Sequence, residues 1–284
     1  MNESSPSPAL PDEPRPMRMI VLAGRRGDGP EPLAERFGES HKCLIPLTDR
    51  PLIAHVLQTG ASHPRIASLA VCVEPEAFEP IYDVLTRQPG RGSVALVEAR
   101  EDLADSVRAA AEGWNGPLIV TTADHALLTA ASIDAMAEAL ESADVALALA
   151  RREDVEAAHP SGQRRYLVLR DGEFAVCDLY GVSGPSALAA AGVFRGRRFD
   201  RSGRRIARAT GLVGLAMTLF GLETLASAVD RASRHLGLAV RAVILGDGSQ
   251  AIDVDDDRTY AVVRDLLERR PEAELKSRPH RAVA

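Results

Sequence analysis

Cysteine is scarce in this sequence of 284 residues, and the three that occur, Cys43, Cys72 and Cys177, lie far apart. An odd number of cysteines at such spacing provides neither a disulfide framework nor a CxxC metal-binding motif. Because free thiols are typical of reducing compartments, we expect a cytoplasmic protein.

An apolar segment is lacking at the N-terminus. Residues 1–17 contain acidic residues and prolines, so we expect a disordered lead-in there and neither a signal peptide nor a membrane anchor. Residues 271–284 are charged and contain prolines, and we expect them to form a flexible tail. The 45% of hydrophobic residues suffices for the core of a single domain over residues 18–270.

An excess of basic charge is also absent. The 34 lysines and arginines stand against 40 aspartates and glutamates, which gives a formal net charge of −6 and an isoelectric point near 5.7. Because the chain lacks a general positive field, we do not expect a nucleic-acid partner. An anionic ligand must instead be bound by a local group of basic residues.

Lysine is rare, since Lys42 and Lys276 are the only lysines among the 34 basic residues. Where a chain has drifted toward arginine, a remaining lysine marks a position that can require it. Lys276 lies in the expected tail, where a solvated side chain is the ordinary interpretation. Lys42 lies between a glycine-rich turn and an apolar run, and it is therefore a candidate functional residue.

Short apolar runs alternate with segments of helical periodicity in the first half of the chain. The runs contain few charges, which is typical of strands that are buried on both faces of a sheet. Alternation of strand and helix predicts an α/β fold with a mainly parallel sheet. The expected strands are 19–23, 69–73, 94–97, 118–120 and 145–149, and the expected helices are 51–59, 77–86, 104–112 and 131–141.

The second half of the chain is less regular. Two apolar segments, 166–169 and 173–176, flank Asp171-Gly172, which predicts a β-hairpin and therefore an antiparallel addition to the sheet. A last strand is expected at 240–245, and a closing helix at about 258–268.

A basic segment precedes an apolar one between residues 195 and 229. The arginines of 195–208 are either solvated or bind a phosphate group of a substrate. Residues 212–229 fall short of the roughly 20 apolar residues that span a bilayer, so we expect a buried helix. Alternatively, the two segments together dock at an anionic membrane surface.

A glycine-rich turn follows the first expected strand. Its sequence, Leu-Ala-Gly-Arg-Arg-Gly-Asp-Gly over residues 22–29, lets backbone N–H groups approach phosphates, while Arg26 and Lys42 can neutralise their charge. The spacing matches neither the GxGxxG nor the GxxxxGK[ST] motif. Taken alone, the turn is as readily explained as a surface loop.

Carboxylates follow two expected strands. Asp124 lies after the strand at 118–120, where ligands bind in open α/β sheets, and it is a candidate Mg²⁺ ligand. Alternatively, Asp124 is the N-cap of a helix that starts at Ala126. Asp253 and Asp255 follow the last strand, and either can be a second ligand, while residues 255–257 can cap the closing helix.

These features together resemble the MobA-like nucleotidyltransferases. The resemblance rests on the Leu-Ala-Gly-x-Arg turn, the lysine followed by Leu-Ile-Pro-Leu and Arg-Pro-Leu-Ile, the Thr-Ala-Asp-His-x-Leu-Leu strand end, and the late Ile-Asp-Val-Asp. It covers residues 18–268 and implies a Rossmann-like, three-layer α/β/α fold of the GT-A type with a mixed, mainly parallel sheet.

The resemblance also implies roles for individual residues. The nucleotide cradle would be formed by Leu22, Ala23, Gly24 and Arg25, with Arg25 at the position of the usual second glycine. Arg26 would lie beside the triphosphate, and Lys42 would hold its phosphates. Asp124 with Asp255 (or Asp253) would bind Mg²⁺ or Mn²⁺. Ala104-Asp105-Ser106-Val107 is similar to a helix start in the methylerythritol-phosphate cytidylyltransferases, where the serine helps to hold the base. The alternative is that Ser106 is an N-cap.

The implied reaction transfers a nucleoside monophosphate from an NTP, GTP or CTP, to a phosphorylated small-molecule or lipid-linked acceptor and releases pyrophosphate. Arg204 and Arg205 are candidates for binding the acceptor within a region of about residues 160–235. His125, beside Asp124, either tunes the site or is structural. The alternatives are a GT-A glycosyltransferase, in which Asp253-Val254-Asp255 is a DxD motif, and a non-catalytic nucleotide-binding module.

Overall fold

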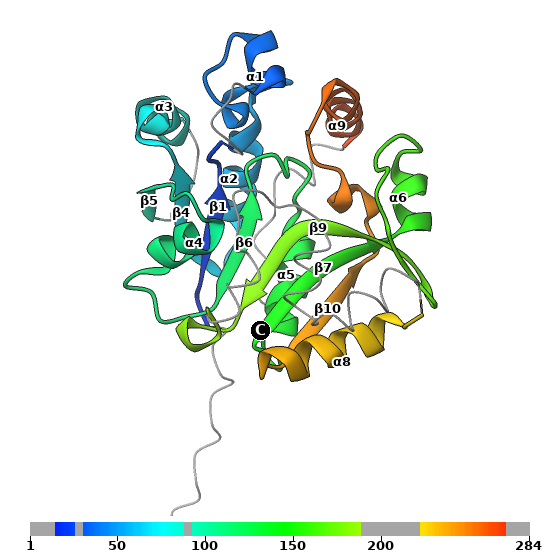
Figure 1. Cartoon of the computed structure of the whole chain (residues 1–284). Coiled ribbons are helices and arrows are strands. Elements are labelled where there is room, and N and C mark those ends of the chain that lie inside the picture. Colours follow the sequence, from blue (N-terminus) through cyan, green and yellow to red (C-terminus); the bar gives the residue numbers. More distant parts are fainter. Residues whose placement is uncertain (1–14, 26–30, 88–92, 189–221, 271–284) are drawn as a thin grey trace, which may run out of the picture.

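A computed structural model describes residues 15–25, 31–87, 93–188 and 222–270 (Figure 1). Its centre is a mixed, mainly parallel sheet of eight strands, ordered β10-β7-β9-β6-β1-β4-β5, with β8 paired to β9. The strands are β1 (Met17–Leu22), β4 (Ile66–Val73), β5 (Ser93–Glu98), β6 (Leu118–Thr122), β7 (Val145–Arg151), β8 (Leu167–Leu169), β9 (Gly172–Val182) and β10 (Val240–Leu245). A separate two-stranded ribbon joins β2 (Pro46–Leu47) and β3 (Arg50–Pro51).

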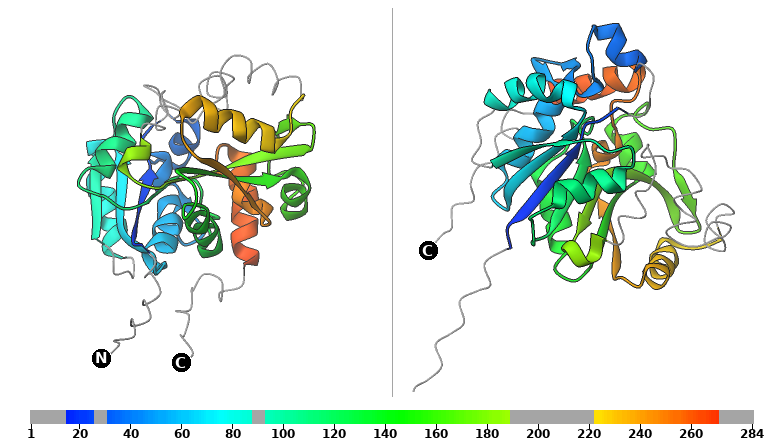
Figure 2. Two further views of the ribbon diagram at one scale, coloured as in Figure 1. Left: turned by 90° about the horizontal axis from the view of Figure 1, so that it is seen from below. Right: turned by 60° about the vertical axis from the view of Figure 1, so that its left-hand side comes forward.

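Helices lie on both sides of this sheet, as the three views in Figures 1 and 2 show. The α-helices are α1 (Pro32–Phe37), α2 (Leu52–Ser62), α3 (Phe78–Thr86), α4 (Leu103–Ala111), α5 (Ala130–Ala139), α6 (Arg152–Ala158), α8 (Leu225–Leu236) and α9 (Asp257–Arg269). Short 3-10 turns are η1 (Lys42–Leu44), η2 (Pro75–Ala77) and η4 (Gly248–Ala251). The fold class predicted from the sequence is confirmed.

The strand pairing also agrees with the sequence pattern. β1 runs parallel to β4 and β6, β4 to β5, and β7 to β10. β8 and β9 form the predicted antiparallel hairpin, and the turn uses Gly172 at a φ of 148°, a conformation that L side chains rarely adopt. β9 then continues antiparallel between β6 and β7, so it joins the two halves of the sheet.

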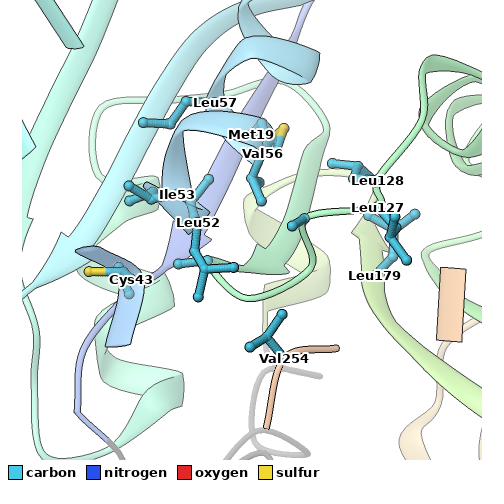
Figure 3. Close-up of a cluster of buried hydrophobic side chains, with 14 of the residues drawn as sticks. Met19, Cys43, Leu52, Ile53, Val56, Leu57, Leu127, Leu128, Leu179 and Val254 are labelled. Carbon is cyan, nitrogen blue, oxygen red and sulfur yellow. The ribbon is translucent and has the colours of Figure 1, made fainter. Parts of the chain in front are cut away.

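The central strand β1 has apolar residues on both faces, which is why its sequence is an uninterrupted apolar run. Met19 and Val21 contribute to the larger core cluster, which includes side chains of α2, α5 and α9. Figure 3 shows part of this cluster, with Met19 beside side chains of α2. Ile20 and Leu22 point to the other face, where they pack with Val107 of α4. Burial on both faces leaves the ends of the strands as the positions where polar side chains can meet a ligand.

The expectation for residues 212–229 is wrong where the structure describes them. Helix α8 begins at Leu225, continues to Leu236, and has Ala232 as its one buried residue. The reason is that polar and charged side chains follow Val229, so the helix is amphipathic. It packs against β10 through one face, and its other faces are partly or fully exposed. Residues 189–221, including the whole arginine-rich segment of 195–208, lie outside the described part. Within the described residues, no helix has the length and apolarity that crossing a membrane requires.

Candidate active site

A pocket of about 240 Å³ opens at the carboxyl ends of β1, β4, β5 and β6. The turn after β1, the residues that follow β4 and β5, the loop after β6, η1 and the first turns of α4 line it. These segments are distant in sequence, and they meet because the strands are parallel and end at the same edge of the sheet. The pocket lies where ligands of open α/β sheets bind.

The turn after β1 contributes Leu22, Ala23, Gly24 and Arg25 to the pocket. A side chain at Gly24 would have its Cβ 3.1 Å from the Cβ of Ala99 and 3.2 Å from Oε1 of Glu74, which explains the glycine by close packing. Arg25 adopts no positive φ, so the backbone of the turn accommodates it without left-handed strain.

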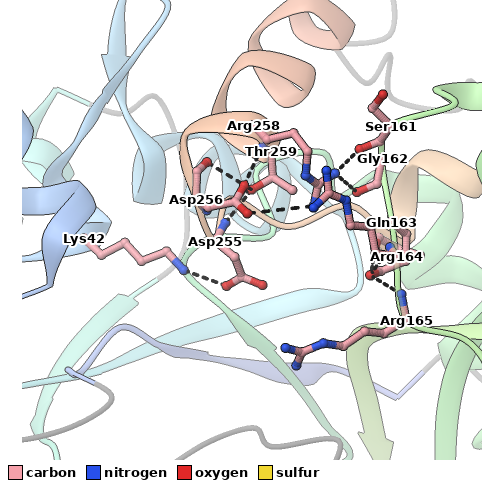
Figure 4. A network of polar contacts seen from close by, with 11 residues as sticks. Lys42, Ser161, Gly162, Gln163, Arg164, Arg165, Asp255, Asp256, Arg258 and Thr259 are labelled. Carbon is pink, nitrogen blue, oxygen red and sulfur yellow. Dashed lines mark hydrogen bonds and ion pairs between the residues drawn. The ribbon is translucent and has the colours of Figure 1, made fainter.

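Lys42 joins two of the predicted acidic residues. Its ammonium nitrogen Nζ lies 2.5 Å from Oδ2 of Asp124 and 3.1 Å from Oδ1 of Asp255. Figure 4 shows the contact with Asp255. The side chains of Lys42 and Asp124 are largely buried, whereas that of Asp255 is about half exposed. A backbone hydrogen bond from the N–H of Val254 to the carbonyl of Asp124 brings the two acidic segments together.

The acidic run before α9 has divided roles. Asp256 is the N-cap of α9 and forms a capping box with Thr259, and Asp257 is the first helical residue. Asp255 is left to face Lys42, so capping and site formation coexist, as the sequence allowed. Asp253 is buried two residues earlier, and the segment between them is not a strand.

The donor set suits a hard divalent cation. Asp124 and Asp255 each approach the same ammonium group, so two carboxylates lie around one position that already holds positive charge. Among the described residues, no group of three or more histidine, cysteine, aspartate or glutamate side chains forms a closed metal site. Two carboxylates without further protein ligands fit Mg²⁺, which keeps waters and binds substrate phosphates in its remaining positions.

Comparison with known proteins places the chain in a family. A profile of the MobA-like NTP transferase domain matches residues 19–210, more than half of the sequence. The chain belongs to this family. It is therefore a nucleotidyltransferase, as the motifs in the sequence indicate. No curated protein sequence matches the chain.

Solved structures agree with the family assignment. The transferase is similar to a hypothetical transferase from Thermus thermophilus, at 25% identity and a TM-score of 0.67, over 87% of this chain and 99% of that one. It shares the fold of 4-diphosphocytidyl-2C-methyl-D-erythritol synthase from Anaerococcus prevotii, at 8% identity and a TM-score of 0.57, over 90% and 100% of the two chains. It also shares the fold of a CMP:2-keto-3-deoxy-manno-octonic acid synthetase that is complexed with CTP, at 14% identity and a TM-score of 0.56, over 89% and 98%.

Two capping alternatives considered from the sequence are wrong. Helix α5 begins at Ala130 with Thr129 as its N-cap, so Asp124 does not cap it. Helix α4 is capped by Asp102, and Ser106 lies inside this helix. Ser106 is buried and lines the pocket, and its hydroxyl accepts a hydrogen bond of 2.9 Å from the backbone N–H of Arg100.

Two thiols and a histidine near the pocket are not nucleophiles in this transferase. Burial raises the pKa of Cys72 to about 12 and that of Cys43 as well, so both thiols that line the pocket stay protonated at neutral pH. His125 is fully buried, and burial lowers its pKa to about 4, so its ring is neutral. Its Nδ1 lies 3.1 Å from the hydroxyl of Thr121, which is the environment of a structural residue.

Sequence reasoning missed the glutamates that line the pocket, among them Glu74 and Glu31. Glu74 lines the pocket and accepts a hydrogen bond from the N–H of Arg25, and Glu31 accepts one from the N–H of Lys42. Glu74 directly follows an expected strand, so the argument used for Asp124 would have found it. Glu31 lies in a loop and carried no such signal. Arg26, Arg204 and Arg205 lie outside the described residues.

Proposed function

We propose that the protein transfers a nucleoside monophosphate from an NTP to a phosphorylated acceptor. An oxygen of the acceptor phosphate attacks the α-phosphorus of the NTP and forms a new P–O bond. The bond between the α-phosphorus and its bridging oxygen to the β-phosphate breaks, and pyrophosphate leaves with that electron pair. Such a transfer requires positioning and neutralisation of charge rather than an enzyme nucleophile.

The observation that carries the proposal is the position of Lys42 between Asp124 and Asp255, beside the glycine turn. The backbone N–H groups of a tight turn are suited to phosphate oxygens. Lys42 can neutralise phosphate charge as a compact ammonium group. Arg25 and Arg100 also line the pocket, so further positive charge is available to a triphosphate. We include Arg26 in this role because it follows Arg25 directly in the sequence.

Asp124 and Asp255, or Asp253 in place of Asp255, would hold Mg²⁺ or Mn²⁺. When bound, the metal supplies charge neutralisation and alignment of the phosphates. The protein's own contribution is to hold both carboxylates next to Lys42. The acidic groups and the ammonium group are thus already close together before the nucleotide binds.

The remaining elements of the proposal concern the substrates. We propose GTP or CTP as the nucleotide, with Ser106 at the base side of the pocket. Arg204 and Arg205 would bind the acceptor, a phosphorylated small molecule or a lipid-linked phosphate, within residues 160–235 of a catalytic domain that spans 18–270. A lipid-linked acceptor would bring peripheral membrane contact. A cytoplasmic location is supported by three free cysteines.

The test is pyrophosphate release from each of the four NTPs with a panel of phosphorylated sugars and polyols. We expect release with one NTP, dependent on Mg²⁺ or Mn²⁺, and a loss of at least about 100-fold in Asp124→Asn, since electrostatic contacts of this kind contribute several kcal/mol. Asp134→Asn is the control, because Asp134 is exposed and contacts His63 outside the pocket. Binding should also raise the melting temperature.

Other outcomes would reject the proposal. Stabilisation by nucleotide-sugars alone, with sugar transfer, would establish the glycosyltransferase alternative. Metal-dependent NTP binding without pyrophosphate release across the panel, including lipid-linked phosphates on vesicles, would favour the non-catalytic module.

A further inference from the structure

A closed ring of contacts lies beside the pocket, and two of its members, Arg25 and Glu74, line it. The N–H of Arg25 donates to Oε1 of Glu74 at 2.8 Å, and Oε2 of Glu74 lies 3.4 Å from Nε2 of His41. Nδ1 of His41 lies 2.9 Å from the hydroxyl of Ser40, and the guanidinium group of Arg25 donates to the carbonyl of Ser40 at 3.1 Å. The ring therefore joins the turn after β1, the end of β4 and the segment that leads into Lys42.

Burial makes this ring more than a set of surface contacts. His41 is 1% exposed, and the side chain of Glu74 is 28% exposed. Burial by itself would raise the pKa of Glu74, but the contacts with His41 and with the backbone N–H groups of Glu74 and Arg25 outweigh it and hold this pKa below its usual range. Glu74 is thus a carboxylate at neutral pH, and its hydrogen bond to Arg25 is charge-assisted.

Glycine at position 24 is part of the same arrangement. Oε1 of Glu74 would lie 3.2 Å from a Cβ at this position, which is tighter than an ordinary contact. Glycine therefore lets the carboxylate approach the turn. Arg25 stands where related turns have a second glycine, and here its side chain forms one side of the ring.

We propose that Glu74 and His41 are positioning residues that hold the glycine turn and Lys42 at a fixed separation. This inference rests on the proposed function, in which the turn and Lys42 bind the same triphosphate. The turn lies at the end of one strand and Lys42 in a 3-10 turn 18 positions later, so their spacing depends on a tertiary link. Glu74 contacts the turn through the N–H of Arg25, and it also contacts His41, which is the residue before Lys42.

The first experiment uses the free protein and needs no substrate. Hydrogen exchange is compared in wild type, Glu74→Ala, Glu74→Gln and His41→Asn, in peptides that contain residues 23–25 and 41–44. We expect Glu74→Ala to accelerate exchange about tenfold in residues 23–25, because the hydrogen bond from the N–H of Arg25 is lost. We also expect faster exchange in residues 41–44, because the 3.4 Å contact with His41 is lost. Glu74→Gln keeps an oxygen acceptor and should restore most of the protection in residues 23–25. His41→Asn should affect 41–44 more than 23–25.

The second experiment measures the consequence for nucleotide use. We expect Glu74→Ala to raise the KM for the NTP about tenfold or more while kcat falls less, since the cradle is misplaced but Lys42, Asp124 and Asp255 remain. Glu76→Ala is the control, because Glu76 is an exposed residue of η2 next to the ring. Where Glu74→Ala fails to fold, Glu74→Gln and His41→Asn carry both measurements.

The two proposals fail in different ways. Unchanged exchange at 41–44 in both the Glu74 and His41 variants would overturn the link between the turn and Lys42, whatever the wild type binds. A changed requirement for Mg²⁺ with an unchanged KM for the NTP would instead make Glu74 a metal ligand and also overturn the positioning role. A wild type that binds no NTP and releases no pyrophosphate with any acceptor would overturn the proposed function, while the exchange measurement still decides the link.

Discussion

Lys42 is a lysine in a chain whose other basic residues are almost all arginine, which indicates that its position requires lysine. Arginine has replaced lysine almost everywhere in this chain, yet lysine remains between Asp124 and Asp255. An ammonium group is a compact point charge with three donors, whereas guanidinium is a planar fork that needs more space. A largely buried position between two carboxylates therefore favours lysine.

Lys42→Arg should consequently lower kcat/KM for pyrophosphate release by at least about tenfold, although the charge is unchanged. The matched control is Lys276→Arg, which changes the other lysine of the chain in the same way and should leave kcat/KM within twofold. Equal activity of the two variants would show that charge alone is required at position 42.

His55 makes a separate prediction at the same scale. Burial lowers its pKa to about 4, and its Nε2 contacts the carbonyl of Leu47 at 3.1 Å. The folded state thus binds this proton more weakly than the unfolded state, whose pKa is near 6.5. The resulting stabilisation is fully present above pH 6.5 and is lost as the pH falls from 6.5 toward 4.

We therefore expect the free energy of unfolding to fall between pH 7 and pH 5, with about 2 kcal/mol of this loss due to His55. Urea titrations at the two pH values measure it, and His55→Leu should show a loss smaller by that amount. A variant with the same pH dependence as wild type would mean that this histidine is accessible to protons in the folded state.

The start of α9 shows how a single element serves both stability and the site. Asp256 accepts a hydrogen bond from the N–H of Thr259 at 2.8 Å, and the N–H of Asp256 donates to the hydroxyl of Thr259 at 3.0 Å. The preceding residue, Asp255, faces Lys42. Adjacent aspartates of one acidic run therefore have different functions, because the chain turns into a helix between them.

Substitution separates these functions. Asp256→Ala should lower the free energy of unfolding by about 1 kcal/mol, the usual cost of a lost N-cap, with a small effect on metal-dependent NTP binding. Asp255→Ala should change stability little and weaken that binding at least tenfold. Thermal unfolding with and without Mg²⁺ and NTP measures both quantities. Equal effects of the two variants on binding would assign the metal-side role to the whole run.

At the scale of the whole molecule, β9 determines how the parts are joined. It lies antiparallel between β6 and β7. The sheet therefore continues from β5, β4, β1 and β6, whose ends form the pocket, to β7 and β10. The three cysteines lie in different parts of the fold. Cys72 is in β4 and Cys177 is in β9, both strands of the sheet, and Cys43 is in the 3-10 turn η1. All three are buried.

Continuity of the sheet predicts that the three thiols become reactive together. In a urea series, labelling by a thiol reagent should be slow in the native state and should rise for all three cysteines over one transition. Mass spectrometry of the labelled peptides distinguishes the sites. Exposure of Cys177 at a lower urea concentration than Cys72 would mean that the two halves unfold separately.

The sequence by itself determined the architecture and the main candidates of the site. Apolar runs buried on both faces, helical periodicity and the Asp-Gly turn are local signals, and each is set by neighbouring residues in the chain. Lys42, Asp124 and Asp255 were found because they stand at strand ends or within motifs of the family, and the rule that parallel strands end at one edge brings such residues together.

Tertiary structure decided what no local signal could. The N-caps depended on where each helix starts, so the capping alternatives for Ser106 and Asp124 were wrong: Asp102 caps α4 and Thr129 caps α5. The amphipathic α8 replaced an expected buried helix, because burial depends on what packs against a segment. The roles of Glu74 and His41 arise from contacts between residues 33 positions apart, and only the folded chain makes such distances short.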